Sequence, residues 1–309
     1  MKSTLFSAFR LLSRTLGGRG IGKIPGVVPV YDYLYSRLKP GGLTVVESDG
    51  HRILVDPRDA AIARHFLLRA GYEPEEKEIF KRIVEPGMVV VDVGANIGDY
   101  TLLAARGAGP SGLVYAVEPE PHNFSLLTRN VAENGYTNVR CLNMALAGEA
   151  GRLTLHVDPA NYGGSSLIAS NVPGTAKAVE VVTDTLDHLL AANRPPRPAG
   201  LIKMDAQGAE AGIMEGARRT LEIPDLCLVI EFWPYGLRNF QSDPVAFLDL
   251  FRARGFEIRV VEADGLRETS VDAMFAECER RDEGRGSIDL LFARPPRMAS
   301  IERKFSTVR

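Results

Sequence analysis

The sequence predicts a doubly wound α/β fold, in which a mostly parallel sheet lies between helices, and three observations predict it. First, an apolar run over residues 88–93, rich in valine and interrupted by Asp92 alone, ends in a glycine turn and is followed by helical spacing. Second, strand-like and helical patterns alternate from there to residue 232. Third, strand-like runs at 256–261 and 287–293 are close enough in sequence to pair as a terminal antiparallel hairpin.

An N-terminal extension over residues 1–72 precedes this fold. Apolar residues recur at helical spacing near its start, and the cations of the first two dozen residues meet no acid before Asp32. The apolar set is Leu5, Phe6, Phe9, Leu12 and Leu16, and the cations are Lys2, Arg10, Arg14, Arg19 and Lys23. Such a basic amphipathic helix can lie on an anionic membrane surface or dock its apolar side on the domain. Both interpretations are open at this point.

The rest of the extension is predicted to contain a linker, two helices and a hairpin. Residues 17–29 are rich in glycine and proline, which is typical of a linker, and residues 31–38 form a short helix. Two alternating runs, 43–46 and 52–55, flank Asp49-Gly50, which indicates a β-hairpin. A helix over 57–68 completes the extension.

The main domain is expected to span residues 73–295, with a tail over 296–309. Its helices are predicted at 75–84, 100–106, 122–134, 186–191, 210–221 and 244–254, and its further strands at 113–117, 139–143, 201–205 and 226–232. An insertion lies between the strands at 139–143 and 201–205. Its β-like runs at 153–157 and 179–183 flank small polar residues, which favours a mobile hairpin or lid, or a surface loop without a role in the site.

Composition limits the function. The 309 residues are 45% hydrophobic and 25% charged, and the formal net charge of -2 shows no electrostatic footprint for nucleic acid. The three cysteines are far apart and no Cys/His spacing suits a metal, so we expect no metal site and reduced thiols in a cytoplasmic protein. We see no apolar run that suits a membrane span or a cleavable signal peptide.

The glycine turn after residue 93 predicts a small-molecule site. Its glycines are Gly94 and Gly98, with Asn96 between them, so it matches neither the dinucleotide fingerprint nor the phosphate loop. Acids end two neighbouring strands, namely Asp92 before the turn and Glu118 where a ribose diol would bind. Acids near the turn suit a cation better than a pyrophosphate. The ligand predicted here is S-adenosylmethionine, whose amino group and sulfonium are positive; the alternative is a structural turn with a capping aspartate.

Several motifs together resemble the FkbM family of S-adenosylmethionine-dependent methyltransferases, which have a Rossmann-like class I methyltransferase fold. The resemblance covers about residues 73–292 in order. Its motifs are Val91-Asp92-Val93-Gly94-Ala95-Asn96-Ile97-Gly98, Ala116-Val117-Glu118-Pro119-Glu120-Pro121, Asn143-Met144-Ala145-Leu146, Gly164-Ser165-Ser166-Leu167, Thr185-Leu186-Asp187, Ile202-Lys203-Met204-Asp205-Ala206-Gln207-Gly208-Ala209-Glu210 and Val229-Ile230-Glu231-Phe232.

The resemblance implies roles for individual residues at the donor site. It places the methionine side of the donor at Asp92, Gly94, Asn96 and Gly98. It places the ribose hydroxyls at Glu118 and adenine at Asn143. It also counts Pro119, which follows Glu118, and Asp205 among the residues that bind the donor. These assignments agree with the ends of parallel strands lining the ligand crevice of an open sheet.

Methyl transfer to a hydroxyl benefits from a general base, and three residues are candidates. Asp205 comes first because it ends a parallel strand on the edge that holds Asp92; its alternative role is to cap a helix. Glu231 ends the next strand, or is a solvated rim residue. His122 has a useful near-neutral pKa range, or belongs only to the first turn of a helix. Gln207 departs from the family, in which an acid is frequent, and argues against a mechanism that needs a carboxylate there.

The expected reaction is therefore O-methylation of a sugar, glycan or related secondary metabolite. A nicotinamide-dependent oxidoreductase shares a glycine turn followed by an acid-ended strand, although Asn96 and the terminal hairpin disfavour it. A catalytically inactive methyltransferase fold that serves as a binding protein is the third reading. The basic N-terminus suggests peripheral contact with the inner membrane surface, while the oligomeric state is not visible in the sequence.

Overall fold

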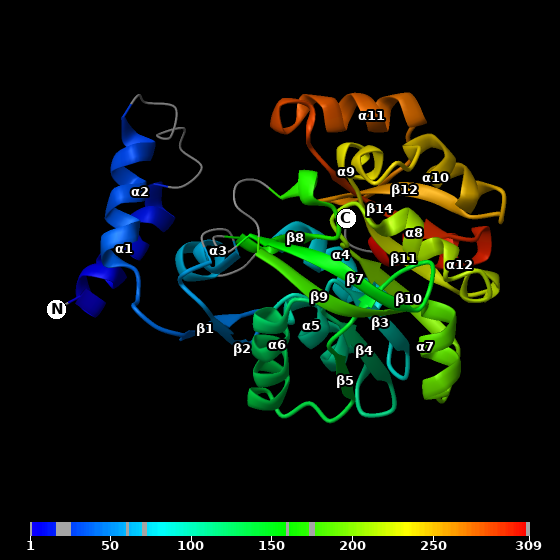
Figure 1. Ribbon diagram of the computed structural model, residues 1–309, viewed down its shortest axis with the longest axis horizontal. Coiled ribbons are helices and arrows are strands. Elements are labelled where there is room, and N and C mark those ends of the chain that lie inside the picture. The colour runs from blue at the N-terminus through cyan, green and yellow to red at the C-terminus, as the bar shows by residue number, and fades with distance from the viewer. Residues whose placement is uncertain are drawn as a thin grey trace. The chain divides into compact units, whose positions relative to one another are not determined.

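The computed structural model describes residues 2–16, 26–59, 62–69, 73–158, 161–172 and 177–306 (Figure 1). By its internal contacts the chain divides into two compact units, residues 1–72 and residues 73–309. The units are described separately.

The first unit consists of three helices and a hairpin. Helix α1 spans Lys2–Leu16, α2 spans Val27–Leu38 and α3 spans Ile62–Arg69, while β1 (Thr44–Ser48) pairs antiparallel with β2 (His51–Val55). The hairpin and the first helix confirm the sequence predictions. Phe9 of α1 packs against Tyr31 of α2, with ring centroids 5.1 Å apart, so these two helices contact each other.

Two boundaries in this unit differ from those expected. Helix α2 begins at Val27, inside the stretch predicted as a linker, because Pro29 fits the first helical turn, where its missing N–H is not needed. The rest of that predicted linker, residues 17–25, lies outside the described residues. Helix α3 begins at Ile62 instead of residue 57, because the Asp56 side chain accepts from the Arg58 N–H and Asp59 N–H donates to the Asp56 carbonyl, which makes a turn.

The second unit is built on an eight-stranded sheet whose order is β13-β12-β14-β11-β10-β3-β4-β5. The strands β3 (Val89–Val93), β4 (Leu113–Val117), β5 (Val139–Leu142), β10 (Ala199–Met204) and β11 (Cys227–Phe232) are parallel. Strand β14 (Ile288–Ala293) runs antiparallel between β11 and β12 (Glu257–Glu262), and β13 (Gly265–Arg267) pairs with β12. The predicted sheet and its terminal antiparallel hairpin are confirmed.

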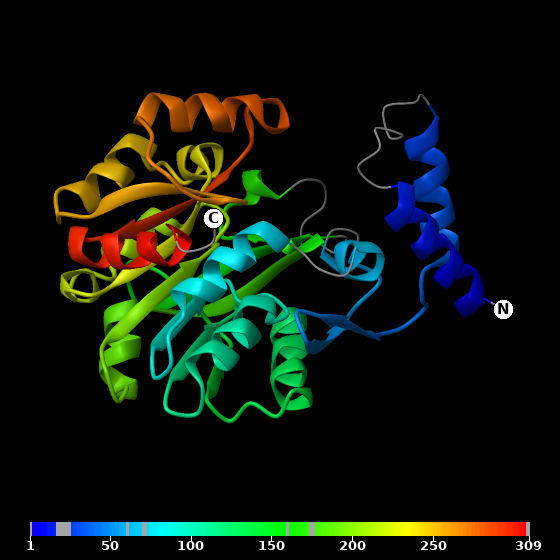
Figure 2. The ribbon, with the colours of Figure 1, turned by 180° about the vertical axis from the view of Figure 1, so that it is seen from behind.

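Helices cover both faces of this sheet. On one face pack α4 (Pro74–Ile83), α5 (Asp99–Ala108) and α12 (Pro295–Ser306), which lie in front of the sheet in Figure 2. The other face holds α7 (Leu186–Asn193), α8 (Glu210–Glu215), α9 (Pro234–Asn239), α10 (Pro244–Arg252) and α11 (Val271–Arg280). Val89 and Val91 belong to one apolar core and Val90 to the other, as the alternation of a strand requires. This alternation later decides where each functional side chain points.

The C-terminal segment that we expected to be a tail is a helix. Residues 296–306 belong to α12, in which Met298 and Ile301 are fully buried against the sheet. Arg297 and Lys304 each bind Glu85, which ties this helix to the end of α4. The apolar pair lies three residues apart, a helical spacing that we overlooked because charged residues surround it.

The insertion forms a second sheet of its own instead of a simple hairpin. Strands β6 (Ala145–Leu146), β7 (Gly151–Asp158), β8 (Asn161–Ser166) and β9 (Lys177–Asp184) follow the order β6-β9-β7-β8. The segment of small polar residues, expected to connect two strands, is itself the strand β8, which pairs with β7. A short 3-10 turn, Ala169–Asn171, follows it. Leu155, Val157 and Val181 form a small core of this sheet.

Candidate active site

The glycine turn between β3 and α5 adopts a conformation that only small residues permit. Gly94 has φ +73, and a Cβ there would lie 1.9 Å from the Asp205 carbonyl oxygen. The N–H groups of Gly94 and Ala95 both donate to the Val117 carbonyl, at 3.0 Å. Asn96 is also left-handed, with φ 52, a conformation that asparagine tolerates better than most residues. Because Gly94 has no side chain, the backbone of the turn can lie close to the backbone of Asp205 at the carboxyl edge of the sheet.

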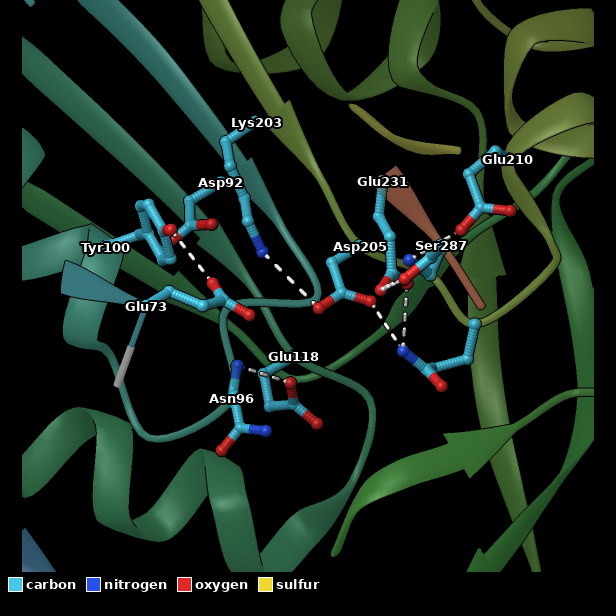
Figure 3. Close-up of polar contacts among 12 residues, drawn as sticks. Glu73, Asp92, Asn96, Tyr100, Glu118, Lys203, Asp205, Glu210, Glu231 and Ser287 are labelled. Carbon is cyan, nitrogen blue, oxygen red and sulfur yellow. Dashed lines mark hydrogen bonds and ion pairs between the residues drawn. The ribbon is translucent and has the colours of Figure 1, made fainter. Parts of the chain in front are cut away.

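Glu118 joins the turn to the next strand. Its carboxylate accepts from the Asn96 N–H at 2.7 Å and from the Glu120 N–H at 2.9 Å, and the side chain is buried (Figure 3). Burial raises the pKa of Glu118 to about 8, although the two N–H donors act in the opposite direction. Each oxygen keeps a second lone pair, so the carboxylate can accept further hydrogen bonds from a ligand.

A cleft lies at this edge of the sheet. Five of the predicted site residues line it, namely Gly94, Asn96, Glu118, Pro119 and Asp205. The small sheet of the insertion contributes Leu155, Tyr162, Gly163 and Ser165 to the wall. Of the two alternatives for the insertion, these four residues favour a segment that borders the site over a surface loop without a role in it.

Asp205 lies where the cleft meets the end of β10. Its N–H donates to the Val93 carbonyl at 3.0 Å, so its backbone is attached to the glycine turn. The side-chain amide of Gln207 donates to Asp205 Oδ1 at 2.7 Å and to Glu231 Oε2 at 3.3 Å. Glu231 also accepts from the Ser287 hydroxyl at 2.8 Å, and Figure 3 shows Glu231 and Ser287 next to Asp205.

An ionisable row continues beneath Asp205 on the face covered by α4 and α5. Lys203 is level with Asp92 in the register of β10 and β3, and its ammonium lies 3.8 Å from Asp205 Oδ2. It also lies 5.0 Å from the centre of the Tyr100 ring. Burial alone would lower the pKa of Lys203, but surrounding carboxylates, Asp205 first, raise it above the ordinary value. Lys203 is therefore a permanently charged partner of the site.

Protonation is favoured at the two carboxyl groups that follow in this row. Glu231 is level with Asp289 across β11 and β14. Burial, together with Asp205 and Asp289, raises the pKa of Glu231 well above its ordinary value. Burial, with Glu73 as the next cause, raises the pKa of Asp289 to about 7. The row therefore holds protons near neutral pH, because ionising every member would place like charges together in a poorly solvated region.

The structure separates the remaining predicted residues from the cleft wall. Asp92 is fully buried on the α5 face, where it accepts from the Thr101 hydroxyl at 2.6 Å, and it does not line the cleft. Asn143 donates to the carbonyls of Glu118 and Pro119 and so holds the backbone after β4. Gly98 begins α5. Direct contact of these residues with a donor stays a prediction.

His122 lies in the first turn of α6 (Pro121–Glu133). This is the position expected if the residue belongs only to the start of a helix. Its ring packs against that of Tyr162, with centroids 4.7 Å apart, so it lies behind a residue of the cleft wall. A role for His122 as a base stays a prediction, as does that of Glu231, which reaches the cleft through Gln207.

Sequence reasoning missed the residues that connect the insertion to Asp205. The Gln207 carbonyl accepts from the Ser166 hydroxyl at 2.9 Å and from the Asn171 side-chain amide at 3.0 Å. Gln207 has φ 50, and Gly208 beside it has φ 99. The adjacent glycine in Gln207-Gly208 was the available signal for this turn, but the partners lie 36 and 41 residues away in sequence. Ser287 was missed for the same reason.

Two absences hold for the described part of the chain. It contains no group of three or more histidine, cysteine, aspartate or glutamate side chains that could hold a metal ion. It also contains no helix with the length and apolarity to cross a membrane.

A family model and a curated relative indicate the same family. The profile described as "Methyltransferase FkbM domain" matches residues 92–258. The 31-O-demethyl-FK506 methyltransferase FkbM of Streptomyces tacrolimicus is 27% identical over 160 residues, which are 43% of this chain and 60% of that protein. The match thus spans about three fifths of the relative's length.

Solved structures are similar as well. Methyltransferase FkbM from Methylobacillus flagellatus KT is 17% identical, with 74% of this chain and 52% of that chain covered and a TM-score of 0.40. TYW2 of M. jannaschii in complex with AdoMet is 16% identical, with 83% and 88% covered and a TM-score of 0.42.

Proposed function

The chain belongs to the FkbM family of methyltransferases, and from this premise we propose that it transfers the methyl group of S-adenosylmethionine to a hydroxyl oxygen. One observation supports this most directly. The glycine turn that would hold the donor and the carboxylate that would serve as base are in backbone contact, because Asp205 N–H donates to the Val93 carbonyl at 3.0 Å. Donor and base therefore line a single cleft.

The residues present fit the donor. Gly94, Asn96 and Glu118 line the cleft, and the absence of a side chain at Gly94 lets the turn pack against the Asp205 backbone. Glu118 has lone pairs for the two ribose hydroxyls, and its ionised form favours a cationic ligand. When bound, S-adenosylmethionine supplies a methyl group that is activated by its sulfonium. What the protein must add is alignment of the acceptor and exclusion of water.

Asp205 is the proposed general base. Gln207 holds its Oδ1 and Lys203 lies near its Oδ2, so the carboxylate has a defined orientation at the cleft. In the proposed step, Asp205 accepts the proton of the acceptor hydroxyl as the oxygen bonds to the methyl carbon and the carbon–sulfur bond breaks. Lys203 stabilises the negative charge of the base before the reaction, and Glu231 orients Gln207.

The acceptor is proposed to be a sugar, glycan or related secondary metabolite. The Streptomyces relative is named for methylating a 31-O-demethyl compound, which supports an oxygen acceptor. We further propose that nucleic acid is not the acceptor. Residues 73–309, which form the cleft, contain 26 lysines and arginines against 34 aspartates and glutamates, so phosphates would be repelled.

Transfer of labelled methyl from S-adenosylmethionine into a panel of glycans and polyketide-type alcohols tests this proposal, with the modified atom then mapped. The expected product is a methyl ether, and Asp205→Asn should reduce its formation at least a hundredfold while donor binding persists. The matched control is Asp243→Asn, which changes a helix cap of α10 that has no part in the cleft. Tight binding of NAD without binding of S-adenosylmethionine would contradict the proposal, and donor binding without transfer to any acceptor would favour a binding protein.

A further inference from the structure

Helices α1 and α2 of the first unit are apolar on two sides. On the inner side, Phe6, Phe9 and Tyr35 are buried within the unit. On the outer side of α2, Val30, Tyr33 and Leu34 are exposed at helical spacing. In α1, Leu11 and Leu12 are 65% and 55% exposed. Exposed apolar residues at helical spacing on the side that the unit does not cover are typical of a helix face that binds a partner.

The exposed apolar residues are concentrated here. Of the twelve large apolar side chains that are exposed among the described residues, seven lie on these two helices. The described part of residues 73–309 exposes three, namely Leu153, Val182 and Val245. An apolar surface of this extent marks an interaction site, whereas single exposed apolar residues are normal.

The charge of this part of the sequence selects the partner. Residues 1–46 contain seven lysines and arginines and one acid, Asp32, which forms an ion pair with Arg64 at 2.5 Å. The exposed Arg37 lies over the Tyr33 ring, 5.4 Å from its centre, and this pairs a cation with an amphipathic aromatic ring on the outer face. A second copy of the chain would bring like charges together, which disfavours self-association through this surface.

We propose that the outer faces of α1 and α2 bind the surface of a bilayer that contains anionic phospholipid. The apolar side chains would enter the boundary between headgroups and acyl chains, while arginine and lysine contact the phosphates. Tyrosine is favoured at such interfaces because its ring is apolar and its hydroxyl polar. The inference goes beyond the proposed methyl transfer and does not depend on it.

Flotation of the full chain tests the proposal, with vesicles of phosphatidylcholine alone or mixed with phosphatidylglycerol. The expected result is flotation with the anionic vesicles, weak flotation with the neutral ones, and loss of binding as salt is raised. The double variant Leu12→Ser, Leu34→Ser should float at least about tenfold less. Its matched control is Leu43→Ser, Val45→Ser, which changes two exposed apolar residues of the same unit outside the two helices and should float as the unchanged protein does.

Thermal unfolding shows whether the serine variants fold. If they do not, two charge-reversal variants provide a second test. Arg37→Glu should reduce flotation several-fold, whereas Arg52→Glu, an exposed arginine of the hairpin, should reduce it much less. Failure of the unchanged protein to float, or equal flotation of each variant and its control, overturns the proposal. A dimer that Leu12→Ser, Leu34→Ser dissociates, without flotation, would show that a second copy covers this surface. Binding of S-adenosylmethionine is measured separately. A protein that binds the donor but does not float contradicts this proposal alone and leaves the proposed function standing.

Discussion

Gln207 donates its side-chain amide to Asp205 at 2.7 Å, and the same residue accepts two hydrogen bonds from the insertion through its carbonyl. One residue therefore connects the proposed base with the segment that forms part of the cleft wall. The sequence suggested only that an acid is missing at this position. The structure shows an amide that can donate to two carboxyl groups at once, which a carboxylate there could not do.

Replacement of this amide tests its positioning role. Gln207→Ala removes the hydrogen bond that orients Asp205, and we expect kcat to fall about tenfold with little change in the dissociation constant of S-adenosylmethionine. Gln207→Glu should reduce kcat further, because a third carboxyl group would lie beside Asp205 and Glu231. Steady-state kinetics together with calorimetric donor binding separates the two effects. Equal losses in donor affinity and kcat would instead indicate a general disturbance of the cleft.

A methyl group at the glycine turn should abolish donor binding. Gly94→Ala places a Cβ 1.9 Å from the Asp205 carbonyl oxygen, so either β3 or the turn after β10 must move. The matched control is Gly135→Ala, where φ is +69 but no atom lies within 4 Å of the new Cβ. The control should lose about 1–2 kcal/mol of unfolding free energy from backbone strain alone. Urea unfolding and calorimetric titration measure both variants, and a Gly94→Ala protein that binds the donor normally would refute the assigned cradle.

The carboxyl group of Glu118 should make donor binding depend on pH. Its pKa is raised to about 8 in the free protein, so the ionised form that best accepts hydrogen bonds and attracts a cation increases as pH rises from 7 to 9. Affinity for S-adenosylmethionine should therefore strengthen over this range. Glu118→Gln should weaken binding about 10- to 100-fold and remove that part of the pH dependence. Calorimetry at several pH values checks both, and an unchanged pH dependence in the variant would exclude this residue as its source.

Stability should also depend on pH through the buried carboxyl groups. Burial is the first cause that raises the pKa of Glu210 and of Asp289 to about 7 and of Glu118 to about 8. Between the ordinary carboxyl pKa near 4 and these values, the folded protein binds more protons than the unfolded chain. The free energy of unfolding should therefore decrease as pH rises from about 4.5 to about 8. Urea unfolding across this range measures the slope, and Asp289→Asn should make it shallower.

The sequence alone was sufficient for the sheet, the glycine turn and the family. Runs such as 88–91 are apolar throughout because both faces of a central parallel strand are buried, and this signal does not depend on distant residues. Gly94 and Glu118 were found for a similar reason, since a turn and a strand end are local features. Strand β14 pairs with β12, as the expected terminal hairpin requires. Strand β13 and helix α12 were not predicted, because the first is short and the second is rich in charged residues, so neither has a clear local pattern.

Only the tertiary structure decided which face each polar residue occupies and what it meets there. Asp92 and Glu118 both end neighbouring strands in sequence, yet Asp92 lies one position before its strand ends and so points to the α5 face with Lys203. Glu118 follows the last residue of β4 and lies in the cleft wall. The contacts of Gln207 with Ser166, Asn171 and Glu231 join segments that are 24 to 41 residues apart. Such contacts form when the sheet brings strand ends together, and no local periodicity encodes them.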